Sequence, residues 1–475
     1  MIKVKNLLFS LVILLFIGNT TFAQSINFDK KLGKNNFELV VNTYGLYKDS
    51  SMNEYLNKVG QRLVSNLDSA FFEYKFYIVK NEVPNAFALP GGYIFITTSL
   101  IPILKTEDEL AGIIGHEIIH SNNRHSVRQM KKKIIPSIIT LPIVIIGDII
   151  PVIGTLTSPI MSAEELLFAS YSRKFETEAD KQGVALAAKA GYDPLALPRA
   201  LNRLTSTLEY VTGEKEQKSY FSDHPYTPDR EKEINNIVDN LVINKSDIIT
   251  KDFVMEFDGI LYGRCPYNGI VKDSTLLQLK RDFYIQFPND WAIENNDSIV
   301  FSYNKNKDAA YVLSFDDEKL SPKEAGDIFI KNLPPKNKDM YRGSRIIKVN
   351  ELEAYVLQFE NYYTNDTNFT NVAWLRVGDN LFKISTMSNI KDNIVLLDIT
   401  KTIRPLTKAE KESIMIKYIK IVTAKENETI TDVCKRTNNK VNSELIAVIN
   451  GFDINDKLKE GQEIKIVLEK AYLQK

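Results

Sequence analysis

The 475-residue chain is poor in histidine and cysteine and carries no excess charge of either sign. It contains four histidines and two cysteines, and its 60 basic and 60 acidic residues cancel. Because zero net charge provides no attraction for phosphate, we expect no nucleic-acid partner. Cys265 and Cys434 are too few for a disulfide framework, and whether they pair or remain separate thiols is open. A hydrophobic content of 44% with 25% charged residues is typical of a soluble globular protein, and the length predicts several domains.

The apolar run at the N-terminus is too short for a comfortable membrane span. Two lysines precede this run, Leu7 to Ile17, and the small residues Thr21 and Ala23 follow it. This order is typical of a secretory signal peptide, so we predict that residues 1–23 are removed after Ala23. The alternative is an uncleaved anchor helix. We therefore expect an exported protein in the periplasm of a Gram-negative bacterium, with association with the outer membrane or the cell wall left open.

The sequence pattern changes twice along the chain and predicts an α+β multidomain protein. Residues 24–250 have mainly helical patterns, whereas residues 254–405 alternate aromatic and β-branched residues between polar turns. The second segment therefore predicts a mainly antiparallel sheet, with one helix near residues 321–333. After Pro405 a Thr407–Glu410 capping box predicts a connecting helix over residues 406–417. Residues 418–472 have a strand–helix–helix–strand pattern.

Residues 134–161 are strongly apolar but contain four prolines and an aspartate. These residues argue against an ordinary spanning helix. One interpretation is a pair of short helices packed on the core. The other is a mobile lid or flap that contacts a membrane, because the segment lies between the two halves of the site described next.

Three of the four histidines lie within "GHEIIHSNNRH", residues 115–125. On a helix, His116 and His120 project from one face, so both imidazoles can coordinate one Zn²⁺ ion. Glu117 is placed to reach a zinc-bound water rather than the metal. His125, five residues beyond His120, is off this face, and we interpret it as a structural histidine.

A catalytic zinc site needs a third protein ligand and an open fourth position. The segment "YSRKFETEAD", residues 171–180, offers Glu176 and Asp180 one helical turn apart. We predict that Glu176 binds the zinc and that Asp180 hydrogen-bonds one of the ligand histidines. Taken alone, such an acidic pair is usually a solvated helix face.

A strand is predicted before the histidine motif, after a Pro-Gly-Gly turn, over residues 93–98. An edge strand beside a zinc helix could hold an extended peptide by backbone pairing, and a plain core strand is the alternative. The residues predicted to line this substrate strand are Asn85, Ala86, Tyr93, Ile94 and Phe95.

Four motifs in order, "NAFALPGG", "GHEIIH" with "RH", "SRKFETEAD" with "AGYDP", and "DHPYTPDR", resemble those of the M48 family of zinc metallopeptidases, in its secreted bacterial branch. The resemblance implies a mainly helical, zincin-type domain with a small edge sheet and one zinc ion per chain. It also implies protein or peptide substrates. By this resemblance His116, His120 and Glu176 are the zinc ligands, Glu117 is the general base and Asp180 orients a ligand histidine. His224 is either an oxyanion donor or an inhibitory fourth ligand. Arg230 orients His224 or the substrate.

The C-terminal segments resemble two further modules. Residues 254–405 resemble a domain that often follows secreted zinc proteases, and since they contain no histidine we expect a scaffold or docking role. Residues 420–468 resemble a LysM module in "ETI", "NG" and "LKEGQEI". LysM modules bind N-acetylglucosamine glycans, which implies peptidoglycan as a partner, and a packing domain without glycan binding is the alternative.

Three functions are therefore open. The first is an exported zinc endopeptidase that degrades or matures envelope proteins. The second is a peptidase directed at peptidoglycan. The third is an assembly or quality-control factor for outer-membrane proteins, with its protease site held latent by His224 or by residues 134–161.

Overall fold

The computed structural model describes residues 26–41, 43–134, 171–212, 224, 228–239, 241 and 253–472, the last range with short gaps at 264, 267–268, 296–298, 307, 317–318, 334, 362–367 and 391–392. The predicted signal peptide and nearly all of the apolar segment 134–161 lie outside the described residues. Within them, the helices are all too short or too polar to cross a membrane. The chain divides into two compact units.

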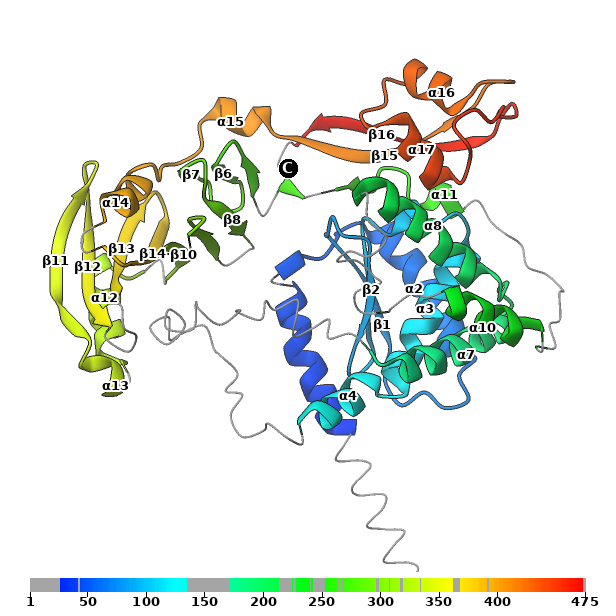
Figure 1. Cartoon of the computed structure of the whole chain (residues 1–475), viewed down its shortest axis with the longest axis horizontal. Helices are drawn as coiled ribbons and strands as arrows, with labels where there is room; N and C mark the ends of the chain where they lie inside the picture. Colours follow the sequence, from blue (N-terminus) through cyan, green and yellow to red (C-terminus); the bar gives the residue numbers. More distant parts are fainter. Residues whose placement is uncertain are drawn as a thin grey trace, which may run out of the picture. The chain divides into compact units, whose positions relative to one another are not determined.

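Unit 1 comprises Met1–Ile138, Ala163–Arg264 and Lys417–Glu469, and it combines helices with small sheets. The helices near its core gather beside the first sheet in Figure 1. They are α2 (Ser50–Val64), α3 (Glu107–Asn122), α4 (His125–Ile134), α7 (Arg173–Lys189), α8 (Ala196–Thr212), α10 (Pro228–Asp239) and α11 (Phe253–Glu256), with a 3-10 turn η1 (Ile101–Ile103).

The first sheet of unit 1 has the strand order β1 (Lys75–Val79), β3 (Tyr93–Thr97), β2 (Ala86–Leu89). β3 pairs with β1 in parallel and with β2 antiparallel. The predicted strand over residues 93–98 is therefore present. The expectation that it lies at a sheet edge is wrong, because its backbone is paired on both sides.

Helix α3 lies in the core of unit 1, and its residues 108–121 are all buried. The hydroxyl of Thr106 accepts a hydrogen bond from the backbone N–H of Glu109 and so caps the helix start. The Glu109 carboxylate does not return the bond to the Thr106 backbone, as a full capping box would. It accepts from the backbone N–H of Lys105 at 2.6 Å and pairs with Arg203. A nearby guanidinium therefore helps to fix where this carboxylate points.

Helices α3 and α7 approach each other closely at a pair of glycines. A Cβ atom added at Gly183 would lie 2.9 Å from the backbone nitrogen of His116, and one added at Gly115 would lie 3.2 Å from the Gly183 carbonyl oxygen. Distances this short leave no room for a larger residue at Gly183. The close crossing places the first turn of α7 beside the middle of α3.

Residues 415–471 form β15 (Met415–Thr423), α16 (Ile430–Arg436), α17 (Ser443–Asn450) and β16 (Glu463–Ala471), which confirms the predicted strand–helix–helix–strand order. Their strands make a three-stranded sheet in the order β16-β15-β4, with β4 spanning Leu261–Tyr262. The buried Lys465 ammonium donates to the backbone carbonyls of Pro102 and Leu104, just before α3. Residues 417–469 thus pack within unit 1, although their sequence pattern suggests a separate module.

Unit 2 comprises Ile139–Ser162, Cys265–Ile416 and Lys470–Lys475. Its main element is a seven-stranded antiparallel sheet, which confirms the predicted antiparallel arrangement. The order is β11 (Tyr341–Val349), β12 (Leu352–Asn361), β13 (Asn368–Val377), β14 (Asn380–Ser388), β10 (Ala309–Phe315), β9 (Val300–Tyr303) and β8 (Ala292–Asn295). A smaller sheet contains β5 (Ile270–Lys272), β6 (Thr275–Gln278) and β7 (Phe283–Gln286).

Short helices accompany these sheets (Figure 1). The predicted helix near residues 321–333 is α12 (Pro322–Lys331), and its Ser321–Glu324 capping box fixes its start. The predicted connecting helix is shorter than expected, α15 (Lys408–Ser413), and the Thr407–Glu410 capping box is complete. The pattern did not predict two more helices, α13 (Pro335–Lys338) and α14 (Ile394–Lys401).

Candidate metal centre

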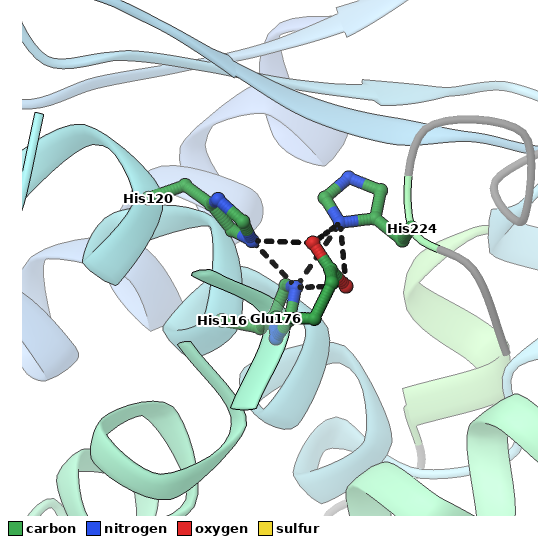
Figure 2. A group of neighbouring side chains, drawn as sticks. All are labelled: His116, His120, Glu176 and His224. Atoms are coloured by element: carbon green, nitrogen blue, oxygen red, sulfur yellow. Dashed lines mark hydrogen bonds and ion pairs between the residues drawn. The ribbon is translucent and has the colours of Figure 1, made fainter. Parts of the chain in front are cut away.

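Four buried side chains from separate parts of unit 1 meet at one point, as Figure 2 shows. His116 and His120 project from α3, Glu176 comes from the first turn of α7, and His224 lies in the short segment before α10. Each offers one nitrogen or oxygen atom, and these four atoms lie within 4.8 Å of one another. The structure therefore brings together the three predicted ligands and the predicted His224.

The distances between these atoms match those expected around a tetrahedral zinc ion. Four ligand atoms about 2.0–2.1 Å from one Zn²⁺ lie about 3.3 Å from each other. His116 Nε2 is 2.9 Å from His120 Nε2 and 3.2 Å from His224 Nδ1. The nearer Glu176 oxygen is 3.1 Å from His224 Nδ1 and 3.3 Å from His120 Nε2. The residues present thus fit a zinc ion in both chemistry and spacing.

The protonation states also suit a cation. Burial lowers the pKa of His116, and burial together with the neighbouring His116 holds the pKa of His120 well below its ordinary value. Burial alone would raise the pKa of Glu176. The charges of His224 and Arg230 and the hydrogen bond from His120 outweigh it and keep that pKa well below the usual range. Two neutral imidazoles and a carboxylate are the forms that bind zinc.

A buried carboxylate–guanidinium pair supports the cluster. Asp180 Oδ1 lies 2.9 Å from His116 Nδ1, the nitrogen that faces away from the cluster. Arg230 donates two hydrogen bonds to the Asp180 carboxylate, at 2.6 and 2.8 Å. The same guanidinium lies 3.0 Å from Glu176 and donates to the backbone carbonyl of His224 at 3.3 Å. Arg230 therefore connects α10 to Asp180, Glu176 and His224, whereas the family resemblance implied only that it orients His224 or substrate.

Glu117 follows His116 on α3 and is fully buried. One of its carboxylate oxygens lies 3.4 Å from His224 Nε2. His224 therefore has one ring nitrogen in the ligand cluster and the other beside the carboxylate that the sequence predicts as the general base. In this conformation His224 supplies the fourth atom of the cluster.

The predicted substrate strand needs a partial correction. Tyr93, Ile94 and Phe95 lie in the central strand β3, so they have no open backbone edge to offer a peptide. Ala86 begins β2, which is an edge strand of this sheet, and Asn85 precedes it. Of the predicted residues, only Ala86 on β2 and the adjacent Asn85 remain where a substrate backbone could pair.

Two aromatic rings beside the cluster were not predicted as part of the site. The ring centroid of Tyr171 lies 4.0 Å from that of His120, and its hydroxyl is 2.7 Å from the Ser126 hydroxyl. His125 lies outside the ligand cluster, as expected, but its Nδ1 is 3.1 Å from His120 Nδ1. In the sequence, the "RH" after the histidine motif, Arg124 and His125, was the feature that could have indicated the contact between His125 and His120.

Comparison with known proteins supports a metallopeptidase in this region. Residues 50–238 match the family model described as Peptidase family M48. A protein of Vibrio cholerae serotype O1 named "Putative beta-barrel assembly-enhancing protease" is 28% identical over 219 residues, which cover 44% of each chain. "Beta-barrel assembly-enhancing protease" of Yersinia pestis is 30% identical over 176 residues, 35% of each chain. "Mitochondrial metalloendopeptidase OMA1" of Schizosaccharomyces pombe is 27% identical over 216 residues, 44% of this chain and 61% of the relative.

The similarity covers less than half of this chain and less than two thirds of each of these relatives. A solved structure from Bacteroides thetaiotaomicron aligns to 42% of this chain with 11% identity and a TM-score of 0.24, which is too low to inform the fold.

Proposed function

We propose that the protein is an exported zinc-dependent metalloendopeptidase that hydrolyses peptide bonds in misfolded or immature envelope proteins. The observation that carries this proposal is the buried cluster of His116, His120, Glu176 and His224, which lies beside Glu117. The match of residues 50–238 to Peptidase family M48 supports the same chemistry.

His116, His120 and Glu176 would hold the zinc ion. A zinc ion bound there lowers the pKa of a coordinated water towards neutrality and polarises a substrate carbonyl. Glu117 is the general base, because its carboxylate lies beside His224 Nε2, whereas the other nearby carboxylate, Asp180, is paired with His116 Nδ1 and Arg230. It removes the proton of the attacking water and then delivers that proton to the departing amine nitrogen. Asp180 and Arg230 fix the orientation of His116 and Glu176 throughout.

We assign His224 to the closed form of the site. Its Nδ1 lies with the ligand atoms and its Nε2 lies next to Glu117, so it stands where water and a peptide carbonyl must enter. His224 must therefore rotate away before cleavage. This arrangement favours a protease that is latent until a substrate or partner binds, in agreement with a role in assembly or quality control.

Protein substrates are the better supported class. The bacterial relatives are named as proteases that enhance β-barrel assembly, and an extended segment of a protein could pair with β2 at Asn85 and Ala86. A site of action in the periplasm follows from the predicted signal peptide, residues 1–23. Glycan binding by residues 420–468 and membrane contact by residues 134–161 are further proposals.

Three versions of the full chain test the function: wild type, Glu117→Gln and His224→Ala. Each is assayed for bound zinc and for cleavage of an unfolded protein. We expect wild type to bind one zinc per chain, and Glu117→Gln to keep the zinc while cleavage falls by about 100- to 10,000-fold. Undiminished cleavage in Glu117→Gln would contradict the mechanism.

His224→Ala separates the two roles of His224. If His224 closes the site, the variant cleaves faster than wild type. A loss of about 100-fold or more would instead assign it to oxyanion stabilisation. Isolated peptidoglycan in parallel assays distinguishes the alternative substrate, because release of stem peptides without protein cleavage would favour a cell-wall peptidase.

A further inference from the structure

We propose that His125 and Glu178 form a second support for the metal site, which orients the ligand His120 as Asp180 orients His116. The inference rests on the proposed zinc site and assigns positioning roles to two residues outside the ligand cluster. His125 is fully buried and its Nδ1 lies 3.1 Å from His120 Nδ1. On its other side, His125 Nε2 lies 3.6 Å from a Glu178 carboxylate oxygen.

A turn between α3 and α4 places His125 beside His120. The turn contains Arg124, which has a φ of 58°, a conformation that non-glycine residues adopt only a few per cent of the time. The Arg124 guanidinium is paired with the buried carboxylate of Asp29 on the N-terminal helix, which spans residues 26–41 in the described part of the chain. This ion pair holds the turn, so the position of His125 is fixed by a contact distant in sequence.

The His125 ring is also fixed in its plane. It is stacked on Phe175, with ring centroids 4.5 Å apart and an interplanar angle of 15°. Phe175 precedes the ligand Glu176 on α7, so the stack connects the support of His120 directly to the third ligand. The Arg128 guanidinium covers the Phe175 ring at 4.7 Å.

The order of protons along this path follows from the geometry. His120 Nε2 faces the cluster, so a neutral His120 that gives Nε2 to a metal carries its proton on Nδ1. The His120 Nδ1–H donates to His125 Nδ1, so His125 Nδ1 must be unprotonated. A neutral His125 then carries its proton on Nε2. The Nε2–H then points towards Glu178, whose carboxylate also accepts from the Asn123 side chain at 2.8 Å.

The two ligand histidines are therefore supported differently. His116 Nδ1 faces the Asp180 carboxylate at 2.9 Å, and this carboxylate is buried and paired with Arg230. His120 donates to a neutral imidazole, and the charge behind it belongs to Glu178, whose side chain is 25% exposed. Partners of this kind fix the tautomer and the ring orientation of a ligand, and their loss typically lowers metal affinity by about 10- to 100-fold.

The test is the zinc affinity of the full chain, measured by competition with a chelator. His125→Phe keeps a ring on Phe175 but has no acceptor for His120. His125→Asn places a carbonyl oxygen near the position of Nδ1 and restores the acceptor. We expect zinc affinity to fall by about 10- to 100-fold in His125→Phe and to return most of the way to wild type in His125→Asn. We expect a smaller loss in Glu178→Gln, because the imidazole acceptor remains.

Two further measurements exclude a purely structural role. The metal-free variants should unfold at the temperature of the metal-free wild type, and the cobalt(II) absorption spectrum of His125→Phe should differ from that of wild type. Lys181→Ala, on the exposed face of α7, serves as the control and should change neither quantity.

The results also separate this inference from the proposed function. Wild-type zinc affinity in His125→Phe, or an equal loss in His125→Asn and His125→Phe, overturns the positioning role while the zinc site stands. Reduced affinity in His125→Phe with rescue in His125→Asn supports the role even if no protein substrate is cleaved. A wild-type chain that binds no zinc overturns both.

Discussion

The two units differ in what they bury. In the described part of the chain, every buried acidic, basic or histidine side chain belongs to unit 1, from Asp29 on the N-terminal helix to Lys465 on β16. The buried polar side chains of unit 2 are neutral, and most are serines and threonines such as Ser302 and Thr370. Both units bury large apolar side chains, and in unit 2 Trp374 and Tyr311 are fully enclosed.

This difference indicates which unit carries ionisable groups that chemistry could use. Burial of a charge costs several kcal/mol, roughly, unless partners compensate it. Unit 1 compensates its charges in pairs, such as Arg230 with Asp180 and Arg203 with Glu109. A unit that needed only stability would have little reason to keep so many ionisable groups inside, so unit 1 is where we place function and unit 2 is where we place a scaffold.

The largest expected effect is a loss of stability in unit 2 that leaves the zinc affinity of unit 1 unchanged. Trp374 packs against Phe329 at a ring distance of 5.4 Å and donates its indole N–H to Asp316 at 2.8 Å. We expect Trp374→Ala to destabilise unit 2 by about 3–5 kcal/mol, from the cavity and the lost hydrogen bond. Zinc affinity, a property of unit 1, should not change.

Fluorescence can follow this variant, because the chain has two tryptophans and both lie in unit 2. The remaining Trp291 reports unfolding of unit 2 in denaturant, and chelator competition reports the zinc site. Trp291→Ala is the matched control, with a smaller loss since Trp291 is only partly buried. If zinc affinity falls together with the stability of unit 2, the zinc site does not depend on unit 1 alone, and the distinction between the two units is wrong.

A smaller effect is expected where α3 and α7 cross. Without a steric clash, Gly183→Ala would stabilise a helix by about 0.5–1 kcal/mol. Here the new methyl would lie 2.9 Å from the His116 backbone, so we expect a net loss of about 1–3 kcal/mol as the helices separate. Zinc affinity should fall as well, because the crossing places Glu176 beside the histidines. If Gly183→Ala is more stable than wild type and keeps full zinc affinity, then α7 does not approach the His116 backbone closely at Gly183.

The last effect concerns Lys465 and is seen only as pH changes. Burial lowers the pKa of this lysine from 10.5 to about 7 in the folded chain. Between these values the unfolded chain holds more protons than the folded chain, so stability rises with pH. Relative to Lys465→Met, we expect wild type to gain up to about 1.4 kcal/mol per pH unit between pH 7 and 10.5, and nothing below pH 7.

The comparison of melting temperatures at pH 6.5 and pH 9.5 checks this expectation. Lys459→Met, at an exposed position of the same segment, is the control and should show little pH dependence relative to wild type. A difference between wild type and Lys465→Met that does not change with pH would mean that Lys465 keeps an ordinary pKa.

Local patterns predicted the elements of the fold well. Alternation predicted the antiparallel strands of residues 254–405, and helical spacing placed His116 and His120 on one face of α3. The capping residues Thr407 and Glu410 marked the start of α15. Each of these features depends on residues within about one or two turns of each other, which is the range over which such patterns act.

The features that were missed depend on contacts between distant segments. The sequence pattern of the strand Tyr93–Thr97 would be the same at the edge or in the centre of a sheet. The strand is central only because β1 pairs with its second side. Arg203, 94 residues away, helps to fix the Glu109 carboxylate, which therefore does not complete a capping box with Thr106. The contact of Arg230 with Asp180 arises from the packing of α10 on α7, and the place of His125 beside His120 from the turn at Arg124, which the distant Asp29 holds.

The central claim is that residues far apart in sequence form one zinc site, with Glu176 as its third ligand. The most direct test is the zinc content of wild type and Glu176→Gln after dialysis against a weak chelator. We predict one zinc per chain in wild type and almost none in Glu176→Gln, with the fold retained by circular dichroism. A Glu176→Gln chain that keeps one zinc with wild-type affinity would contradict the claim.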